Sequence, residues 1–212
     1  MNYALPQYQL VLASMSMTRR QMLENAGLTF TPAAAPVDEE ALRLAGQAEG
    51  IGTIDMATAL AEAKAARASQ KYPEAFVIGA DQLLECDGVW YGKPESRAAA
   101  EQTLASLSGK THHLVTAAVI MQGGRRIWQH CDRPAVSIRT LDTSDIGDYL
   151  DAIGTAAFET PGCYQIEGLG AQIISKIDGC PYAILGLPLL QLLAFLRQHG
   201  LHATDTGSGV KA

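Results

Sequence analysis

The order of apolar and polar positions predicts that the chain opens with a strand, a tight turn and a helix. The β-prone run YQLVLA at 8–13 stops at Ser14, and the segment MTRRQMLENAG at 17–27 has the pattern of a helix that ends at its glycine. A second short strand is predicted at 28–31. The alanine-rich segment 55–71 carries few charges, as expected of a helix that packs on a sheet.

Further along, the pattern mixes helices with hairpins. The run EAFVIGAD at 74–81 predicts a buried strand with an acid at its far end, and Asp87-Gly88 between the apolar runs 83–86 and 89–91 is a strong hairpin signal. The remaining predicted elements are a helix at 94–107, strands at 112–121 and 126–139, a helix at 143–152, strands at 164–166 and 171–176, and a helix at 187–199. This order predicts an α/β fold with a mixed sheet and helices on its faces.

Length and charge narrow the class of protein. The chain of 212 residues is long enough for one domain with a large core, which we expect at 1–202, while the polar segment 203–212 has little to bury and is predicted to be a disordered tail. Sixteen basic residues stand against 22 acidic ones, a net charge of −6, so no partner such as nucleic acid or an anionic membrane is expected.

No targeting or disulfide pattern stands out. The longest apolar stretch, 184–196, is shorter than the roughly 18–20 residues of a membrane-spanning helix, and the first residues lack a basic secretory start, so we expect a cytoplasmic protein. The four cysteines contain no C-x-x-C pair, which favours buried free thiols over a zinc site.

The turn after the first strand carries the pattern Ser14-x-Ser16-x-x-Arg19-Arg20. A helix N-terminus offers unpaired N–H groups, and two hydroxyls with a guanidinium beside it would make a pocket for an anion. The alternative is a serine that only caps the helix, next to a solvated arginine pair.

A second candidate is Asp81, an acid placed after a buried apolar run. A carboxylate at a strand end can hold a metal ion or take a proton from water, or it can simply cap the turn into the hairpin. Lys93 lies one hairpin away, and Lys64 is a cation inside an otherwise apolar helix, where it needs a partner or reaches solvent.

Other motifs are excluded or read as structural. The chain has no G-x-x-x-x-G-K-[ST] pattern, and Gly168-Leu169-Gly170 lacks the strand-to-helix context of a dinucleotide fingerprint. His112 and His113 are adjacent on a predicted strand and so point to opposite faces, which suits structural roles better than a shared metal.

Taken in order, these pieces resemble the Maf family of nucleoside triphosphate pyrophosphatases, from about Leu10 to about Leu201. The matching segments are LVLASMSMTRRQMLENAGLTF, the step Val37-Asp38-Glu39, LAEAKA, VIGADQLLECDGVWYGKP, LASLSGKTHHLVTAAV, GCYQIEGLGAQIISKIDG and ILGLPLLQLL. Each motif alone is a weak signal, whereas seven in the family's order are specific.

The resemblance implies an elongated mixed sheet with two lobes and a central cleft, a homodimer, and hydrolysis of the α–β phosphoanhydride of a nucleoside triphosphate to a nucleoside monophosphate and pyrophosphate with Mg²⁺ or Mn²⁺. It implies Asp81 as proton acceptor, with Glu39 as its acidic partner at the metal. The family's phosphate-binding positions fall on Ser14, Ser16, Arg19, Lys64 and Lys93.

Three positions bear on the base. Gln82 and Glu167 match the branch that prefers 7-methyl-GTP, and a carboxylate such as Glu167 can accept hydrogen bonds from the N1–H and amine of a guanine edge. Thr18 departs from both branches of the family, so this position lacks the tryptophan that would face a cationic base.

The resemblance leaves two other readings open. One is a nucleotide-binding regulator without catalysis, linked to cell division, and the other is a phosphatase that releases orthophosphate. The presence of Asp81 and Lys93 favours the enzyme over the regulator.

Overall fold

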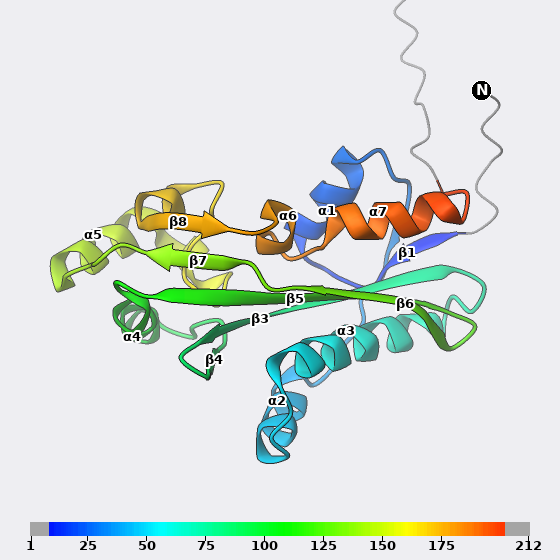
Figure 1. Cartoon of the computed structure of the whole chain (residues 1–212), viewed down its shortest axis with the longest axis horizontal. Helices are drawn as coiled ribbons and strands as arrows, with labels where there is room; N and C mark the ends of the chain where they lie inside the picture. The colour runs from blue at the N-terminus through cyan, green and yellow to red at the C-terminus, as the bar shows by residue number, and fades with distance from the viewer. Residues whose placement is uncertain (1–8, 202–212) are drawn as a thin grey trace, which may run out of the picture.

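The computed structural model describes residues 9–201. Over these residues the chain forms an eight-stranded mixed sheet with helices on its faces, which confirms the predicted fold class (Figure 1). The strand order is β2-β1-β3-β5-β7-β8, with β4 paired to β3 and β6 paired to β5. The tail predicted at 203–212 and the first residue of the strand predicted at 8–13 lie outside the described residues.

The strands are β1 (Leu10–Leu12), β2 (Thr31–Pro32), β3 (Phe76–Cys86), β4 (Val89–Tyr91), β5 (Thr111–Gln122), β6 (Arg125–Asp132), β7 (Ala135–Ile138) and β8 (Ile174–Asp178). The helices are α1 (Met17–Asn25), α2 (Glu39–Ala48), α3 (Thr53–Ser69), α4 (Arg97–Leu107), α5 (Thr143–Ile153), α6 (Pro181–Ile184) and α7 (Leu189–Gln198), with 3-10 turns η1 (Gly154–Phe158) and η2 (Leu169–Gln172).

The long strand β3 is apolar on both faces because helices cover both sides of the sheet. Ile78 packs in a core with α1 and α7, while Val77 packs in a second core against α3. Figure 1 shows these helices above and below the sheet. β3 runs parallel to β1 and antiparallel to β5, so it lies at the centre of the mixed sheet.

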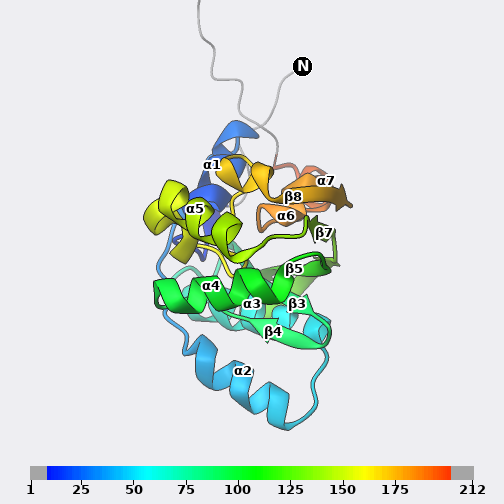
Figure 2. The same ribbon diagram turned by 90° about the vertical axis from the view of Figure 1, so that its left-hand side faces the viewer.

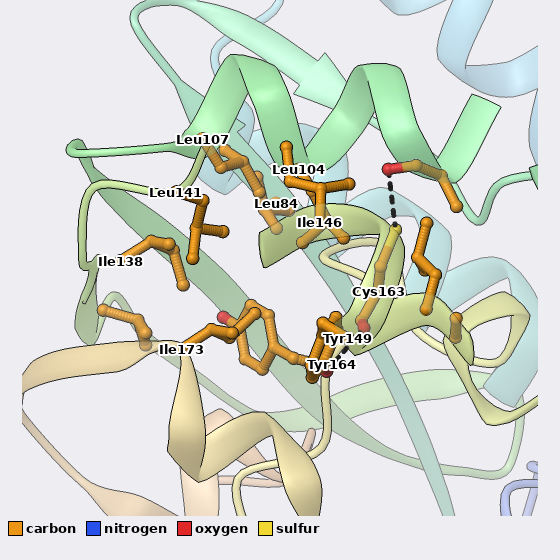
Figure 3. Packing of buried hydrophobic residues seen from close by; sticks show 14 of the residues in the cluster. Leu84, Leu104, Leu107, Ile138, Leu141, Ile146, Tyr149, Cys163, Tyr164 and Ile173 are labelled. Carbon is orange, nitrogen blue, oxygen red and sulfur yellow. Dashed lines mark hydrogen bonds between the residues drawn. The ribbon is translucent and has the colours of Figure 1, made fainter. Parts of the chain in front are cut away.

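A separate core fills the end of the sheet where α4 and α5 lie, the end nearest the viewer in Figure 2. Figure 3 shows Tyr149, Cys163 and Tyr164 among its aliphatic side chains. The Tyr149 hydroxyl donates to the carbonyl of Cys163 at 3.0 Å, and Thr160 Oγ1 bonds both the N–H and the carbonyl of Tyr164. These bonds fix the turn that leads into the segment with Glu167.

Two predicted strands are wrong. The strand predicted at 126–139 is broken into β6 and β7 at Arg133-Pro134, because proline has no N–H for the ladder, although both pieces pair antiparallel with β5. The strand predicted at 164–166 is a turn, since the backbone of Tyr164 bonds Thr160 rather than a neighbouring strand.

The helix α2 is not among the predicted elements. Asp38 caps this helix by accepting from the N–H of Ala41 at 3.0 Å, and Glu39 and Glu40 follow in the first turn, where carboxylates favour a helix start. The acidic run at 38–40 therefore forms the N-terminus of a helix.

Two other features follow from burial and length. Among residues 9–201, no helix has both the length and the apolar character needed to cross a membrane. All four cysteines carry free thiols, with Cys86 and Cys163 buried as expected and Cys131 and Cys180 half-buried.

Candidate active site

The candidate site lies along one edge of β3. β1 pairs with β3 up to Leu12–Ile78, and β4 pairs with it from Leu84–Tyr91 onward. Between these points, β3 residues 79–83 pair with β5 on one side and with no other described strand on the opposite side. We call this five-residue stretch the β3 window.

Asp81 lies at the centre of the β3 window. The prediction that it ends its own strand is wrong, because β3 continues to Cys86; the strand that ends here is the parallel neighbour β1. Side chains alternate along a strand, and both Val77 and Leu83 pack in the core beneath α3, so Asp81 faces α3 as well. Only 5% of this residue is exposed.

Asp81, Lys64 and Glu39 form an ion cluster in which the aspartate is buried and the lysine is mostly buried. Lys64 Nζ lies 2.5 Å from Asp81 Oδ1 and 2.9 Å from Glu39 Oε1. The side chains of Asp81 and Lys64 are 7% and 12% exposed, while that of Glu39 is 42% exposed at the start of α2. The lysine in the apolar helix thus has its partners, and three predicted site residues from three elements meet.

The cluster depends on a close approach of α3 to β3. A Cβ at Gly79 would lie 2.1 Å from the carbonyl oxygen of Ala61 and 2.8 Å from the Cβ of Ala65. Only glycine allows this spacing, and Lys64 lies on the helix between those two alanines.

Ser14, Ser16 and Arg19 gather at the end of β1. Ser16 caps α1 by accepting from the N–H of Arg19 at 3.4 Å, and Ser14 Oγ accepts from the N–H of Ser16 at 3.2 Å and from Arg19 Nη1 at 3.3 Å. Arg19 Nη1 also donates to the Ala80 carbonyl at 2.9 Å, inside the β3 window. The capping alternative therefore holds for Ser16, but Arg19 is anchored in the protein rather than solvated.

Burial and charge act against each other at this site. Burial raises the pKa of Asp81, while the cations of Lys64 and Arg19 lower it without cancelling the rise. Burial lowers the pKa of Arg19, while the carboxylates of Asp81 and Glu39 raise it by a smaller amount. Asp81 is therefore a more basic carboxylate than an exposed aspartate, which suits a group that must accept a proton.

Four other predicted site residues form no hydrogen bond or ion pair with this cluster within residues 9–201. Lys93 and Glu167 are exposed, and Lys93 makes no ion pair with another described residue. Thr18 is half-buried on the first turn of α1. Gln82 is on the opposite face of β3 from Asp81, where its amide donates to Thr116 Oγ1 at 2.8 Å.

Two carboxylates, Asp81 and Glu39, offer oxygen ligands for a hard cation. Within residues 9–201, no three His, Cys, Asp or Glu side chains converge into a preformed metal group. Mg²⁺ on a phosphate substrate needs only one or two protein carboxylates, because the phosphates and water complete its shell. The donor set therefore fits a metal that arrives with a polyphosphate.

Several groups at the site were not found from the sequence. The carbonyls of Ala80 and Gly186 hold Arg19, and backbone acceptors leave no trace in residue identity. Gly79 left a signal, since a glycine inside a buried strand indicates close approach of another backbone.

His112 is fully buried and its Nε2 lies 2.6 Å from Tyr164 Oη, as expected of a structural histidine.

A hollow of about 280 Å³ between α3 and β6 does not contain the predicted site. Its lining includes Asp55, Glu62, Arg126 and His130, and none of the predicted catalytic or phosphate-binding residues. We place the candidate site at the β3 window on the grounds of its buried charges and its position beyond the end of β1.

Known proteins are similar to this chain over most of its length. A family model described as "Maf-like protein" matches residues 9–199. The chain is 46% identical over 191 residues to a "Nucleoside triphosphate pyrophosphatase" of Rhodospirillum rubrum (90% of this chain, 95% of that protein) and 44% identical over 191 residues to one of Granulibacter bethesdensis (90% and 97%). It is also 43% identical over 190 residues to a "7-methyl-GTP pyrophosphatase" of Brucella abortus (90% and 96%). With a family model over nearly all described residues and relatives that match nine-tenths of its length, the chain belongs to the Maf family.

Proposed function

We propose that this protein hydrolyses the α–β phosphoanhydride of nucleoside triphosphates and releases a nucleoside monophosphate and pyrophosphate. The observation that carries the proposal is the buried Asp81–Lys64 pair at the β3 window, with Arg19 anchored on the same stretch of strand. Relatives that match at least nine-tenths of both sequences are named for this activity. A cytoplasmic location, where nucleotide pools are found, fits this role.

Asp81 acts as the proton acceptor. A water molecule that attacks phosphorus must lose a proton, and a carboxylate positions that water and takes the proton. Burial raises the pKa of Asp81, which makes its carboxylate a stronger base than that of an exposed aspartate. Lys64 holds the carboxylate in place and favours its ionised form.

Cationic and N–H groups bind the triphosphate. Arg19, fixed by three acceptors, stabilises charge that develops on the phosphates, and the first turn of α1 adds N–H groups next to Ser14 and Ser16. Lys93 follows β4, which pairs with β3 just beyond the window, and supplies a further cation at the edge of the site.

A divalent cation completes the charge balance. Asp81 and Glu39 are the residues that would hold Mg²⁺ or Mn²⁺, together with the substrate phosphates. The ion would neutralise phosphate charge and so favour attack on a polyanion.

Glu167 and Thr18 are assigned to the base. Glu167 is exposed next to η2 and free to accept from the N–H groups of a guanine-type base, including a 7-methylated one. Thr18 has a short side chain on the first turn of α1 and provides no aromatic ring for that base.

The test is turnover of a panel of triphosphates (7-methyl-GTP, GTP, UTP, dTTP, CTP and ATP) with Mg²⁺ or Mn²⁺, with pyrophosphate and orthophosphate measured separately. We expect pyrophosphate as the phosphate product and loss of turnover when EDTA removes the metal. Orthophosphate as the product would identify a phosphatase instead. Absence of turnover with every triphosphate would refute the proposed function.

A further inference from the structure

The amide nitrogen of Gln82 makes hydrogen bonds on the face of the sheet that Asp81 does not occupy. Gln82 Nε2 donates to Thr116 Oγ1 at 2.8 Å, to the Ala183 carbonyl at 2.9 Å and to the Ile184 carbonyl at 3.0 Å. Carbonyl oxygens only accept, so the amino side of the amide faces α6. Gln82 and Thr116 are direct partners in the β3–β5 register and therefore act from the same face.

These two side chains anchor the end of α6. Helix C-terminal carbonyls lack partners within the helix, and α6 has only four residues. The Ala183 carbonyl accepts from Gln82, from Thr116 Oγ1 at 2.8 Å and from the N–H of Gly186 at 3.0 Å. The sheet thus replaces the missing helical partners and fixes where α6 ends.

Gly186, the second residue after α6, holds Arg19. Gly186 has a positive φ of 98°, and its carbonyl accepts from Arg19 Nε at 2.7 Å. A Cβ at this position would lie 3.4 Å from Arg19 Nε and Nη2, so the turn packs directly on the guanidinium. Arg19 Nη1 in turn donates to Ser14 Oγ and to the Ala80 carbonyl, which lies in the β3 window.

We propose that Gln82 and Thr116 are positioning residues for Arg19: they fix the end of α6, and the turn at Gly186 fixes the guanidinium that binds phosphate. This inference rests on the proposed function for its catalytic consequence. Thr116 is fully buried and cannot reach a nucleotide, so any effect of that residue is indirect. Because every triphosphate carries the same phosphates, loss of this anchor affects all bases alike.

The test uses Gln82→Met, which keeps the length of the side chain but removes its donors, and Thr116→Val, which removes only the hydroxyl. Thr116→Ser restores the hydroxyl and is the matched control. Amide hydrogen exchange over 180–189 is followed in the intact protein without nucleotide, and kcat and KM are measured for the triphosphate panel.

In Gln82→Met and Thr116→Val we expect amide exchange at Leu185, Gly186 and Leu187 to rise roughly fivefold for each hydrogen bond lost. We expect kcat/KM to fall by a similar factor for all bases, with their ranking unchanged and with Thr116→Ser close to wild type. Unchanged exchange over 180–189 in Gln82→Met would overturn the proposal. A changed base ranking in Gln82→Met but not in Thr116→Val would also overturn it, because it would show direct contact with the base.

The two readouts separate this proposal from the proposed function. If the wild-type protein hydrolyses no triphosphate, the proposed function fails, while exchange still decides whether Gln82 and Thr116 anchor α6. If Thr116→Val does not fold, amide exchange over 180–189 in Gln82→Met, compared with wild type, still decides the proposal.

Discussion

Gly79→Ala tests whether the closeness of α3 and β3 builds the site. The new Cβ would lie 2.1 Å from the Ala61 carbonyl oxygen, so α3 and β3 must separate by about 0.9 Å before this contact reaches 3.0 Å, the shortest that Cβ atoms adopt. Both groups in contact belong to regular elements, so no flexible side chain can absorb the shift. Lys64 and Asp81 sit on the two elements that move apart.

The magnitudes follow from this displacement. Overpacking of a filled core costs about 1–3 kcal/mol of unfolding free energy. A misplacement of about 1 Å among catalytic groups lowers turnover by roughly 100-fold. We therefore expect Gly79→Ala to unfold at lower urea concentration and to lose about two orders of magnitude in kcat while still folded.

Gly147→Ala is the matched control. Gly147 lies inside α5, where an added Cβ meets no described atom within 4 Å apart from its chain neighbours and the backbone of its own helix. Alanine there is expected to stabilise the helix by about 0.5–1 kcal/mol and to leave turnover unchanged. Urea unfolding and pyrophosphate release measured on both variants check the prediction. Wild-type turnover in Gly79→Ala would refute the reasoning that helix spacing sets the site.

Two further predictions concern titrating groups. Lys64→Met removes the cation that lowers the pKa of Asp81, so the acid limb of the profile of kcat/KM against pH should move to higher pH. The control is Lys71→Met, at an exposed position, which should leave the acid limb where it is. An unmoved acid limb in Lys64→Met would contradict the ion cluster. Burial lowers the pKa of His112 to about 4, below its unfolded value of about 6.5. The folded state therefore holds His112 neutral, whereas the unfolded chain binds a proton at this residue below about pH 6.5. The free energy of unfolding is therefore unaffected by His112 above pH 6.5 and falls by about 3 kcal/mol as the pH falls towards 4. Urea unfolding at several pH values should show a shallower acid loss in His112→Gln than in wild type, and equal slopes would contradict this assignment.

The sequence predicted the elements whose local signals agree with their packing. The turn from β1 into α1 carries a serine cap and an apolar strand, and α3 carries an alanine-rich face, so both were found. The break at Pro134 carried a local signal, because proline has no N–H for the ladder, but the apolar pattern of 126–139 outweighed it in the prediction. The turn at Tyr164 was missed because its backbone bonds the Thr160 side chain, which the apolar pattern of 164–166 does not show.

Part of the candidate site could also be predicted from the sequence, and part could not. Residue types pointed to Asp81, Lys64 and Arg19, since buried charges need partners. The sequence could not show that Asp81 lies within β3, because the strand continues to Cys86 by pairing with β4 and β5, which come later in the chain. Nor could it show that Gln82 bonds α6, about 100 residues away in the chain.

The central claim is that Asp81 is the proton acceptor of a hydrolase, and the most direct test is Asp81→Asn compared with Asp148→Asn. Asp148 is an exposed aspartate on α5, so its variant controls for loss of a carboxylate elsewhere. Pyrophosphate release and triphosphate affinity are measured on the same samples. We expect Asp81→Asn to keep nucleotide binding and to lose about 10²–10⁴-fold in turnover, with Asp148→Asn unchanged. Turnover near the wild-type rate in Asp81→Asn would contradict the claim, and nucleotide binding without turnover in the wild-type protein would indicate a regulator instead of an enzyme.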